Sequence, residues 1–157
     1  MSFGKIEQPL VIDPLDEKKL SLSGLAFSIE YQKVADARDD AALLDDRTPL
    51  IADGLYLTPA GSSKFATADL IGVYFEVYAP ISPGVDIAVE LRAFDAKGAP
   101  KFDTGMLLVK RQEGRSSSPF AIAIPPSTLE PGTYKVEVTA LDSLNHKFQR
   151  TASVEVR

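Results

Sequence analysis

The only histidine of the sequence, His146, has the side chain best suited to proton transfer near neutral pH. Asp142 and Ser143 lie close to it, so the residue types of a Ser-His-Asp site occur within one short segment. Residues on a single tight turn rarely reach the geometry of such a triad. We therefore expect His146 to be a solvated turn histidine, and we expect the chain not to be an enzyme.

A second group that could do chemistry is a cluster of aspartates, whose carboxylates are the ligands that calcium prefers. The cluster comprises Asp36, Asp39, Asp40, Asp45 and Asp46. The spacing is not that of an EF-hand loop, and Arg38 and Arg47 offset part of the charge. Residues 33–49 are expected to form an acidic loop or a short helix, with calcium binding as an alternative. No cofactor is expected.

Aromatic side chains could form a binding face. The candidates are Tyr56, Phe65, Tyr74, Tyr78 and Phe94. Tyr74, Tyr78 and Phe94 fall on the nominally outer phases of their strands, so they are predicted to form an interaction surface. Either a neighbouring domain or partner docks there, or a second sheet or the N-terminal strands cover them. A carbohydrate-binding module is the alternative function, although such modules mostly use Trp and the chain has none.

The composition is that of a folded protein and excludes several classes of function. The 157 residues are 45% hydrophobic and 25% charged, which is typical of one globular domain. The net charge of −5 argues against binding nucleic acid, which depends on Lys and Arg. No apolar run approaches the roughly 20 residues that span a bilayer, so membrane insertion is not expected. Cysteines and glycine-rich phosphate-binding motifs are absent.

The elements that position these groups are organised around residues 128–142. Pro131 and Gly132 suit a sharp turn. The apolar residues after the turn recur at every second position and predict a strand with one buried face: Tyr134, Val136, Val138 and Ala140. Leu129 before the turn and Tyr134 after it match the tyrosine corner of immunoglobulin-like sandwiches, in which the Tyr hydroxyl bonds to upstream backbone.

Alternating patterns separated by turns predict about nine strands and little helix. The strands are expected near residues 5–12, 20–31, 50–57, 70–78, 85–94, 106–110, 120–124, 134–140 and 148–156. A change of phase at Gly24 predicts a β-bulge. The predicted fold class is all-β, an immunoglobulin-like or fibronectin III-like antiparallel β-sandwich with N-terminal extension strands. One domain is expected over 1–157, with N-terminal strands in 1–32, the acidic segment in 33–49 and the immunoglobulin-like core in 50–157.

Three segments together resemble a known family. They are an aromatic-rich strand ending in Glu-Val-Tyr at 70–78, the Pro-Gly-x-Tyr corner within 129–138, and the Asp-to-Lys-Phe turn at 142–148. They are similar to the C-terminal sandwich region that follows the von Willebrand factor A-type domain in exported bacterial VWFA-related proteins. Glu130 replaces a proline of that corner, and Asn145-His146 stands where glycine is expected; Asn tolerates the left-handed conformation.

The resemblance implies an accessory module that is periplasmic or secreted, with no catalytic residues to carry over. Residues 1–5 lack the pattern of a signal peptide, so we expect either a cytoplasmic protein or a part of a longer exported chain, and the predicted fold favours the second. The chain contains no Asp-x-Ser-x-Ser motif of an A-type domain. The predicted function is docking, as a non-enzymatic accessory or protein-interaction module of an exported multidomain bacterial protein. The predicted partner is a neighbouring domain or another protein.

Overall fold

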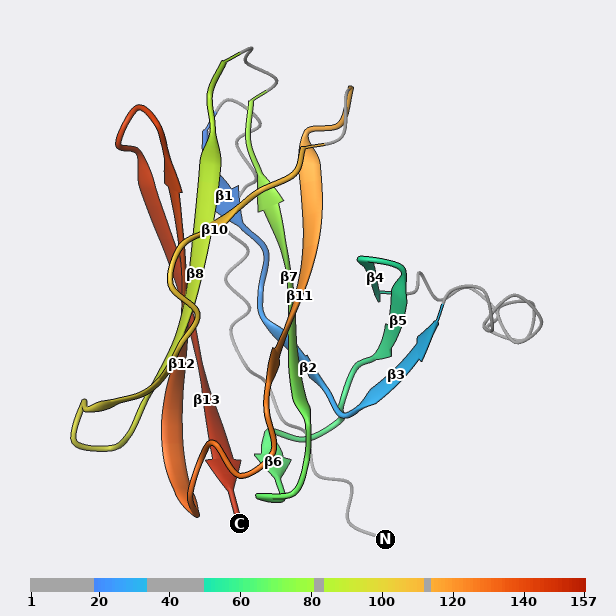
Figure 1. Cartoon of the computed structure of the whole chain (residues 1–157), viewed down its shortest axis with the longest axis vertical. Helices are drawn as coiled ribbons and strands as arrows, with labels where there is room; N and C mark the ends of the chain where they lie inside the picture. The colour runs from blue at the N-terminus through green and yellow to red at the C-terminus, as the bar shows by residue number, and fades with distance from the viewer. Residues whose placement is uncertain (1–18, 34–49, 81–83, 112–113) are drawn as a thin grey trace, which may run out of the picture.

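The computed structural model of the chain describes residues 19–33, 50–80, 84–111 and 114–157. Every regular element assigned in these ranges is a strand, so the predicted all-β fold class is confirmed. The strands, most of them labelled in Figure 1, are β1 (Ser21–Leu22), β2 (Ala26–Ser28), β3 (Glu30–Lys33), β4 (Leu50–Ala52), β5 (Leu55–Thr58), β6 (Lys64–Phe65), β7 (Ile71–Tyr78), β8 (Ile87–Phe94), β9 (Pro100–Asp103), β10 (Leu107–Leu108), β11 (Ser117–Ile124), β12 (Gly132–Asp142) and β13 (Lys147–Val156).

Two sheets face each other and form a sandwich (Figure 1). The six-stranded sheet has the order β10-β8-β12-β13-β6, and β9 also pairs with β8. The four-stranded sheet has the order β1-β7-β11, and β2 also pairs with β7. Strand pairing in both sheets is antiparallel except between β6 and β13, which run parallel.

The core lies between these two sheets, and the period of two in the sequence explains its composition. The apolar phase of β8 is buried: Ile87, Val89, Leu91 and Ala93. The same phase is buried on β12, as predicted from the alternation after the corner. Across the sandwich, Phe75 of β7 is fully buried and its ring stacks on that of Phe120 of β11, with 5.5 Å between the ring centres.

The two sheets divide the long strands between them. Strands β7 and β11 lie in the four-stranded sheet, and strands β8, β12 and β13 lie in the six-stranded sheet. The tyrosine corner lies at the start of β12, as predicted. The Tyr134 hydroxyl donates a hydrogen bond to the Glu130 carbonyl oxygen at 2.8 Å, and Leu129 is buried just ahead of the turn.

We expect Tyr134→Phe to lower the free energy of unfolding by about 1 kcal/mol, which is the typical net value of an intramolecular hydrogen bond. The buried ring is retained, so no cavity is created. The midpoint of urea unfolding measures the change, and its slope should stay constant. Tyr56→Phe is the matched control, because no hydrogen bond joins the Tyr56 hydroxyl to the described residues. An unshifted midpoint for Tyr134→Phe would show that the corner bond does not stabilise the fold.

A third, three-stranded sheet with the order β3-β5-β4 packs on the outer face of the four-stranded sheet (Figure 1). Residues 50–57 were expected in the sandwich core, but β4 and β5 belong to this third sheet. Tyr31 of β3 anchors the sheet, because its hydroxyl lies 2.9 Å from the carbonyl oxygen of Leu70 and 3.1 Å from that of Ser28. Burial raises the pKa of Tyr31 to about 12.

The strand predicted over 20–31 is divided into three. Strands β1 and β2 both pair with β7, on either side of Gly24, where the phase change lies. The chain then leaves the four-stranded sheet at Ile29 and enters β3. The buried Ser28 fixes this crossing, because its Oγ lies 2.6 Å from the Thr58 carbonyl oxygen and accepts a hydrogen bond from the Glu30 N–H at 3.0 Å.

Candidate functional site

The aromatic residues predicted to form one interaction surface lie on different sheets. Tyr74 and Tyr78 belong to β7, whereas Phe94 belongs to β8. Tyr74 is only 6% exposed, because Ala52 and Leu57 of the third sheet pack against it. Burial, together with the hydrogen bond to Glu76, raises the pKa of the Tyr74 phenol. The sequence left two alternatives for these aromatic residues, docking of a partner or cover by another sheet. For Tyr74 the second alternative holds, because the third sheet covers it.

Phe94 and the remaining aromatic candidates do not complete a shared platform. The half-buried ring of Phe94 carries Lys135 over it, with Nζ 4.9 Å from the ring centre. Phe65 is buried and packs against Phe27, with 6.0 Å between the ring centres. Tyr78 is partly buried on β7. The structure thus does not bring together the residues on which the carbohydrate-binding alternative depended.

The candidate calcium ligands Asp36, Asp39, Asp40, Asp45 and Asp46 lie outside the described residues. Within the ranges that are described, no three His, Cys, Asp or Glu side chains gather as a metal site would require. No helix in these ranges has the length and apolar character needed to cross a membrane.

One edge of the six-stranded sheet exposes a run of apolar side chains. Met106, Leu107 and Leu108 are 53%, 38% and 74% exposed. We call these three residues the β10 edge. The sequence predicted a strand here but no role, because alternation does not show whether a strand lies at the end of a sheet. The signal that was present is three consecutive large apolar residues, which is unusual for an exposed segment.

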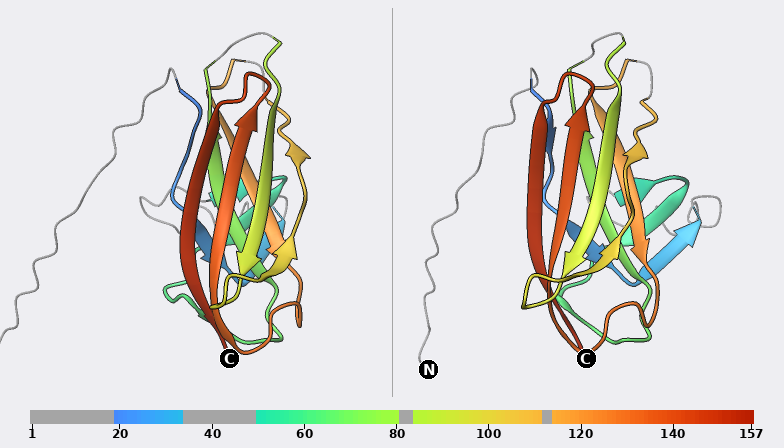
Figure 2. Two further views of the ribbon diagram at one scale, coloured as in Figure 1. Left: turned by 90° about the vertical axis from the view of Figure 1, so that its left-hand side faces the viewer. Right: turned by 60° about the vertical axis from the view of Figure 1, so that its left-hand side comes forward.

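The backbone of the β10 edge also faces outward. The N–H of Val109 donates to the carbonyl oxygen of Ile87 of β8 at 2.8 Å. Alternate residues of an antiparallel strand direct their backbone groups to the same neighbour, so the N–H and C=O of Leu108 point away from β8. Since β10 ends the strand order, no strand among the described residues pairs with these groups. Figure 2 shows this part of the chain at the side of the sandwich.

The edge of the four-stranded sheet on β11 has a different character. The N–H of Ala79 donates to the Ser116 carbonyl oxygen at 3.0 Å, which sets the alternation along β11. The backbone groups of Ser117, Pro119, Ala121 and Ala123 are therefore directed away from β7. Pro119 has no N–H, so this edge cannot form a continuous ladder with a further strand.

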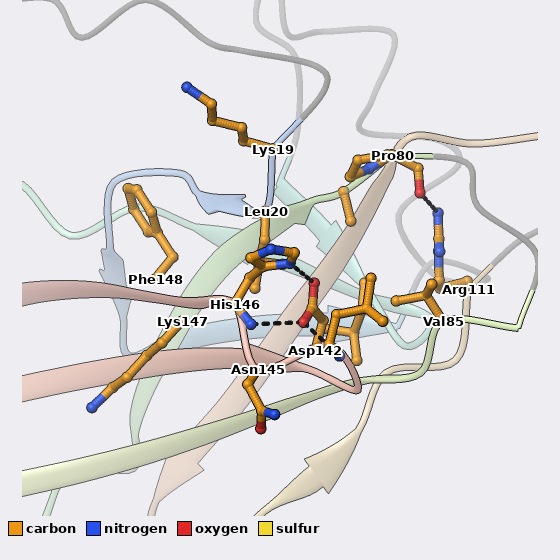
Figure 3. Close-up of a pocket in the computed structure, with 13 residues that line it drawn as sticks. Lys19, Leu20, Pro80, Val85, Arg111, Asp142, Asn145, His146, Lys147 and Phe148 are labelled. Carbon is orange, nitrogen blue, oxygen red and sulfur yellow. Dashed lines mark hydrogen bonds and ion pairs between the residues drawn. The ribbon is translucent and has the colours of Figure 1, made fainter.

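A pocket of about 680 Å³ lies at the end of the sandwich where the turn between β12 and β13 meets the segments after β7 and β10 (Figure 3). Its apolar lining comes from Leu20, Ala79, Val85, Ile87 and Phe148. Its titratable lining comes from Lys19, Arg111, Asp142, His146 and Lys147. Arg111 donates a hydrogen bond to the Pro80 carbonyl oxygen at 2.5 Å.

Asp142 and His146 form a hydrogen-bonded pair at this pocket, with 2.8 Å between Asp142 Oδ2 and His146 Nδ1. Asp142 Oδ1 accepts from the backbone N–H groups of Leu144 and His146 at 2.9 and 2.8 Å. Asn145 adopts a left-handed φ of 67°, as its sequence position predicted, and this closes the turn. His146 is exposed, as expected, but the tight turn does bring it to the aspartate.

The environment of Asp142 keeps it ionised. Its side chain is only 9% exposed, and this burial alone would raise the pKa. The hydrogen bonds from the His146 N–H, the His146 ring and the Leu144 N–H together outweigh burial, so the pKa of Asp142 lies below its usual value. An ionised carboxylate only accepts, so Nδ1 of His146 carries the proton and Nε2 faces outward from the pair. No hydrogen bond links Ser143 to His146 among the described residues, so the triad is incomplete.

Comparisons with known proteins identify no family for this chain. No protein-family model and no curated protein matches the chain. A lysine-substituted form of superoxide reductase (neelaredoxin) from Ignicoccus hospitalis is similar in structure, with a TM-score of 0.45 and 12% identity over 62% of this chain and 77% of that one. A second structure of superoxide reductase (neelaredoxin) from Ignicoccus hospitalis has a TM-score of 0.41 and 11% identity, over 60% of this chain and 75% of its own.

These similarities correct one prediction from the sequence. The chain was expected not to be an enzyme, but the two solved structures described above are superoxide reductases, which are enzymes, so that prediction is withdrawn. The likeness concerns the all-β fold alone and assigns no activity to this chain.

Proposed function

We propose that the chain is a protein-interaction module and that a partner docks on the β10 edge. The partner contributes an extended segment that pairs with the outward backbone groups of Leu108, in the mode known as β-strand addition. The observation that carries this proposal is the combination at Leu108 of a 74% exposed apolar side chain and backbone groups that no described strand pairs.

The contrast between the two sheet edges supports this choice. Natural proteins protect exposed sheet edges with proline, charged side chains or a covering segment, because the unpaired backbone groups of an edge strand can pair with another chain. Pro119 has that role on β11. The β10 edge is short, at two residues of strand, but it carries three apolar side chains, and no proline, charge or covering strand protects it within the described part of the chain. An exposed apolar patch of this kind is the pattern of a surface that is covered when the protein functions.

The wider context of the proposal is an accessory module, located outside the cytoplasm, of a larger exported protein. What supports this part is the resemblance of residues 70–78, 129–138 and 142–148 to the sandwich region of VWFA-related proteins. In this context a neighbouring domain of the same parent chain or a separate protein supplies the docking segment.

Site-specific photocrosslinking tests the docking surface. Benzoylphenylalanine is introduced at position 108 of the full parent chain in its own cells, and at position 144 as the control, because Leu144 is also an exposed leucine (62%). We expect an adduct at position 108, within the parent chain or with one partner, and none at position 144. Equal adducts at both positions, or none at 108, would contradict the proposal.

The crosslinked segment then allows a quantitative test. We expect a synthetic peptide of that segment to bind the wild-type chain and to bind Leu108→Lys at least about 10-fold more weakly, because a charge would enter an apolar contact. The control Leu144→Lys should bind as the wild type does. Backbone pairing predicts, in addition, that the Leu108 amide becomes protected from hydrogen exchange in the complex. Unchanged affinity and exchange at position 108 would place docking elsewhere.

A further inference from the structure

The pocket at the end of the sandwich has the size and composition of a small-molecule site. Its volume of about 680 Å³ lies within the roughly 300–1,000 Å³ typical of ligand pockets. Leu20, Ala79 and Ile87 are buried and form an apolar floor. Sites of this kind combine an apolar surface with a few polar groups that fix the ligand's orientation. The site is separate from the β10 edge and does not depend on the proposed docking.

The charge available to a ligand in this pocket is positive. Asp142 is the only carboxylate in the described lining, and its oxygens already accept three hydrogen bonds from Leu144 and His146. Arg111 and Lys147 supply cations at the same pocket. A chain with a net charge of −5 thus places cationic side chains around an apolar floor.

Arg111 is the cation placed to receive an anion. Figure 3 shows its guanidinium group at the side of the pocket formed by Pro80 and Val85. The amines of Lys19 and Lys147 extend away from Asp142 and His146, which lie at the centre of the view. Arg111 makes one hydrogen bond within the described residues, to the Pro80 carbonyl oxygen. A guanidinium group has five N–H donors in a planar fork, so donors remain for a carboxylate.

We infer that this pocket binds a small organic acid with an apolar body, whose carboxylate pairs with Arg111 and whose hydrocarbon part rests on Leu20 and Ile87. The inference follows from the apolar floor, the internally satisfied Asp142 and the guanidinium group at the rim. An organic cation of the same shape lacks a carboxylate partner, because the Asp142 carboxylate already accepts hydrogen bonds from residues of its own turn.

A charge series of one scaffold tests the inference on the wild-type chain. The probes are 4-phenylbutyrate, 4-phenylbutanol and 4-phenylbutylamine, titrated by two-dimensional NMR of the labelled protein. We expect 4-phenylbutyrate to shift the amides of Leu20, Val85, Ile87 and Phe148, and to bind at least about 10-fold more tightly than the amine. Equal binding of the acid and the amine, or no shift at these amides up to millimolar probe, would overturn the inference.

A pair of variants assigns the carboxylate partner. Arg111→Gln should weaken 4-phenylbutyrate binding at least about 10-fold and leave 4-phenylbutanol unchanged, which a loss of structure would not do. Arg115→Gln is the matched control, because it removes an exposed charge outside the pocket lining. Arg111→Lys should restore part of the affinity. If Arg111→Gln binds 4-phenylbutyrate as tightly as the wild type does, Arg111 is not the partner of the carboxylate and the inference fails. The same holds if Arg111→Gln and Arg115→Gln lower the affinity for 4-phenylbutyrate equally.

Discussion

Replacing Phe75 by alanine should lower the free energy of unfolding by about 3–5 kcal/mol, which is a large part of the stability of a domain of this size. Phe75 is fully buried in the centre of β7, and its ring stacks almost parallel to that of Phe120 at an angle of 6°. Removing the ring leaves a cavity and ends the ring contact with Phe120 of the neighbouring strand. We expect a marked fall in the midpoint of urea unfolding.

The control for Phe75→Ala is Leu144→Ala, which truncates an exposed side chain. Surface substitutions of this kind usually change stability by less than about 0.5 kcal/mol. We therefore expect the Leu144→Ala midpoint to match that of the wild type. If both variants unfolded at the wild-type midpoint, Phe75 would not be part of the packed interior.

Gly72→Ala should weaken the attachment of the third sheet to the sandwich. A Cβ at position 72 would lie 2.7 Å from Cε1 and 2.8 Å from Cζ of Tyr31, closer than real Cβ atoms approach. The Tyr31 ring must move, and its hydroxyl then loses the carbonyl oxygens of Ser28 and Leu70. We expect a loss of about 1–3 kcal/mol from overpacking.

Two measurements separate this effect from a general loss of stability. The pKa of Tyr31, raised by burial to about 12, should fall toward its ordinary value of 10.0 when the ring moves into solvent, as followed by NMR of Cζ-labelled tyrosine. In the double variant with Tyr31→Ala the clash is absent, so the combined cost should be smaller than the sum of the two single costs. Strict additivity, with an unchanged Tyr31 titration, would contradict this account.

Local patterns predicted the parts of the fold that depend on neighbouring residues. The alternation of β8 and β12 identified their buried phases, and the pattern from Leu129 to Tyr134 predicted the corner that the hydrogen bond to Glu130 confirms. The third sheet could not be predicted in this way. Its position depends on Tyr31 meeting Gly72, and no periodicity records a contact between residues so far apart in the sequence.

The candidate sites were harder to predict, because each depends on position within the assembled sheets. Tyr74 has the pattern of an outer residue, but it is covered by Ala52 and Leu57 of a distant segment. Leu108 has the pattern of a buried strand residue, but it lies where the six-stranded sheet ends. Asp142 and His146 were recognised as neighbours; the left-handed Asn145 brings their side chains together.

The parallel pairing of β6 with β13 has a mechanical consequence. The N–H groups of Glu155, Arg157 and Thr67 donate to carbonyl oxygens of the opposite segment at 2.8, 2.9 and 3.0 Å. Tension that draws the start of β6 and the end of β13 in opposite directions would shear these two parallel strands along each other. All three bonds would then carry the load at the same time and would have to break together. The parallel pairing of β6 with β13 therefore makes the sandwich resistant to stretching in this direction.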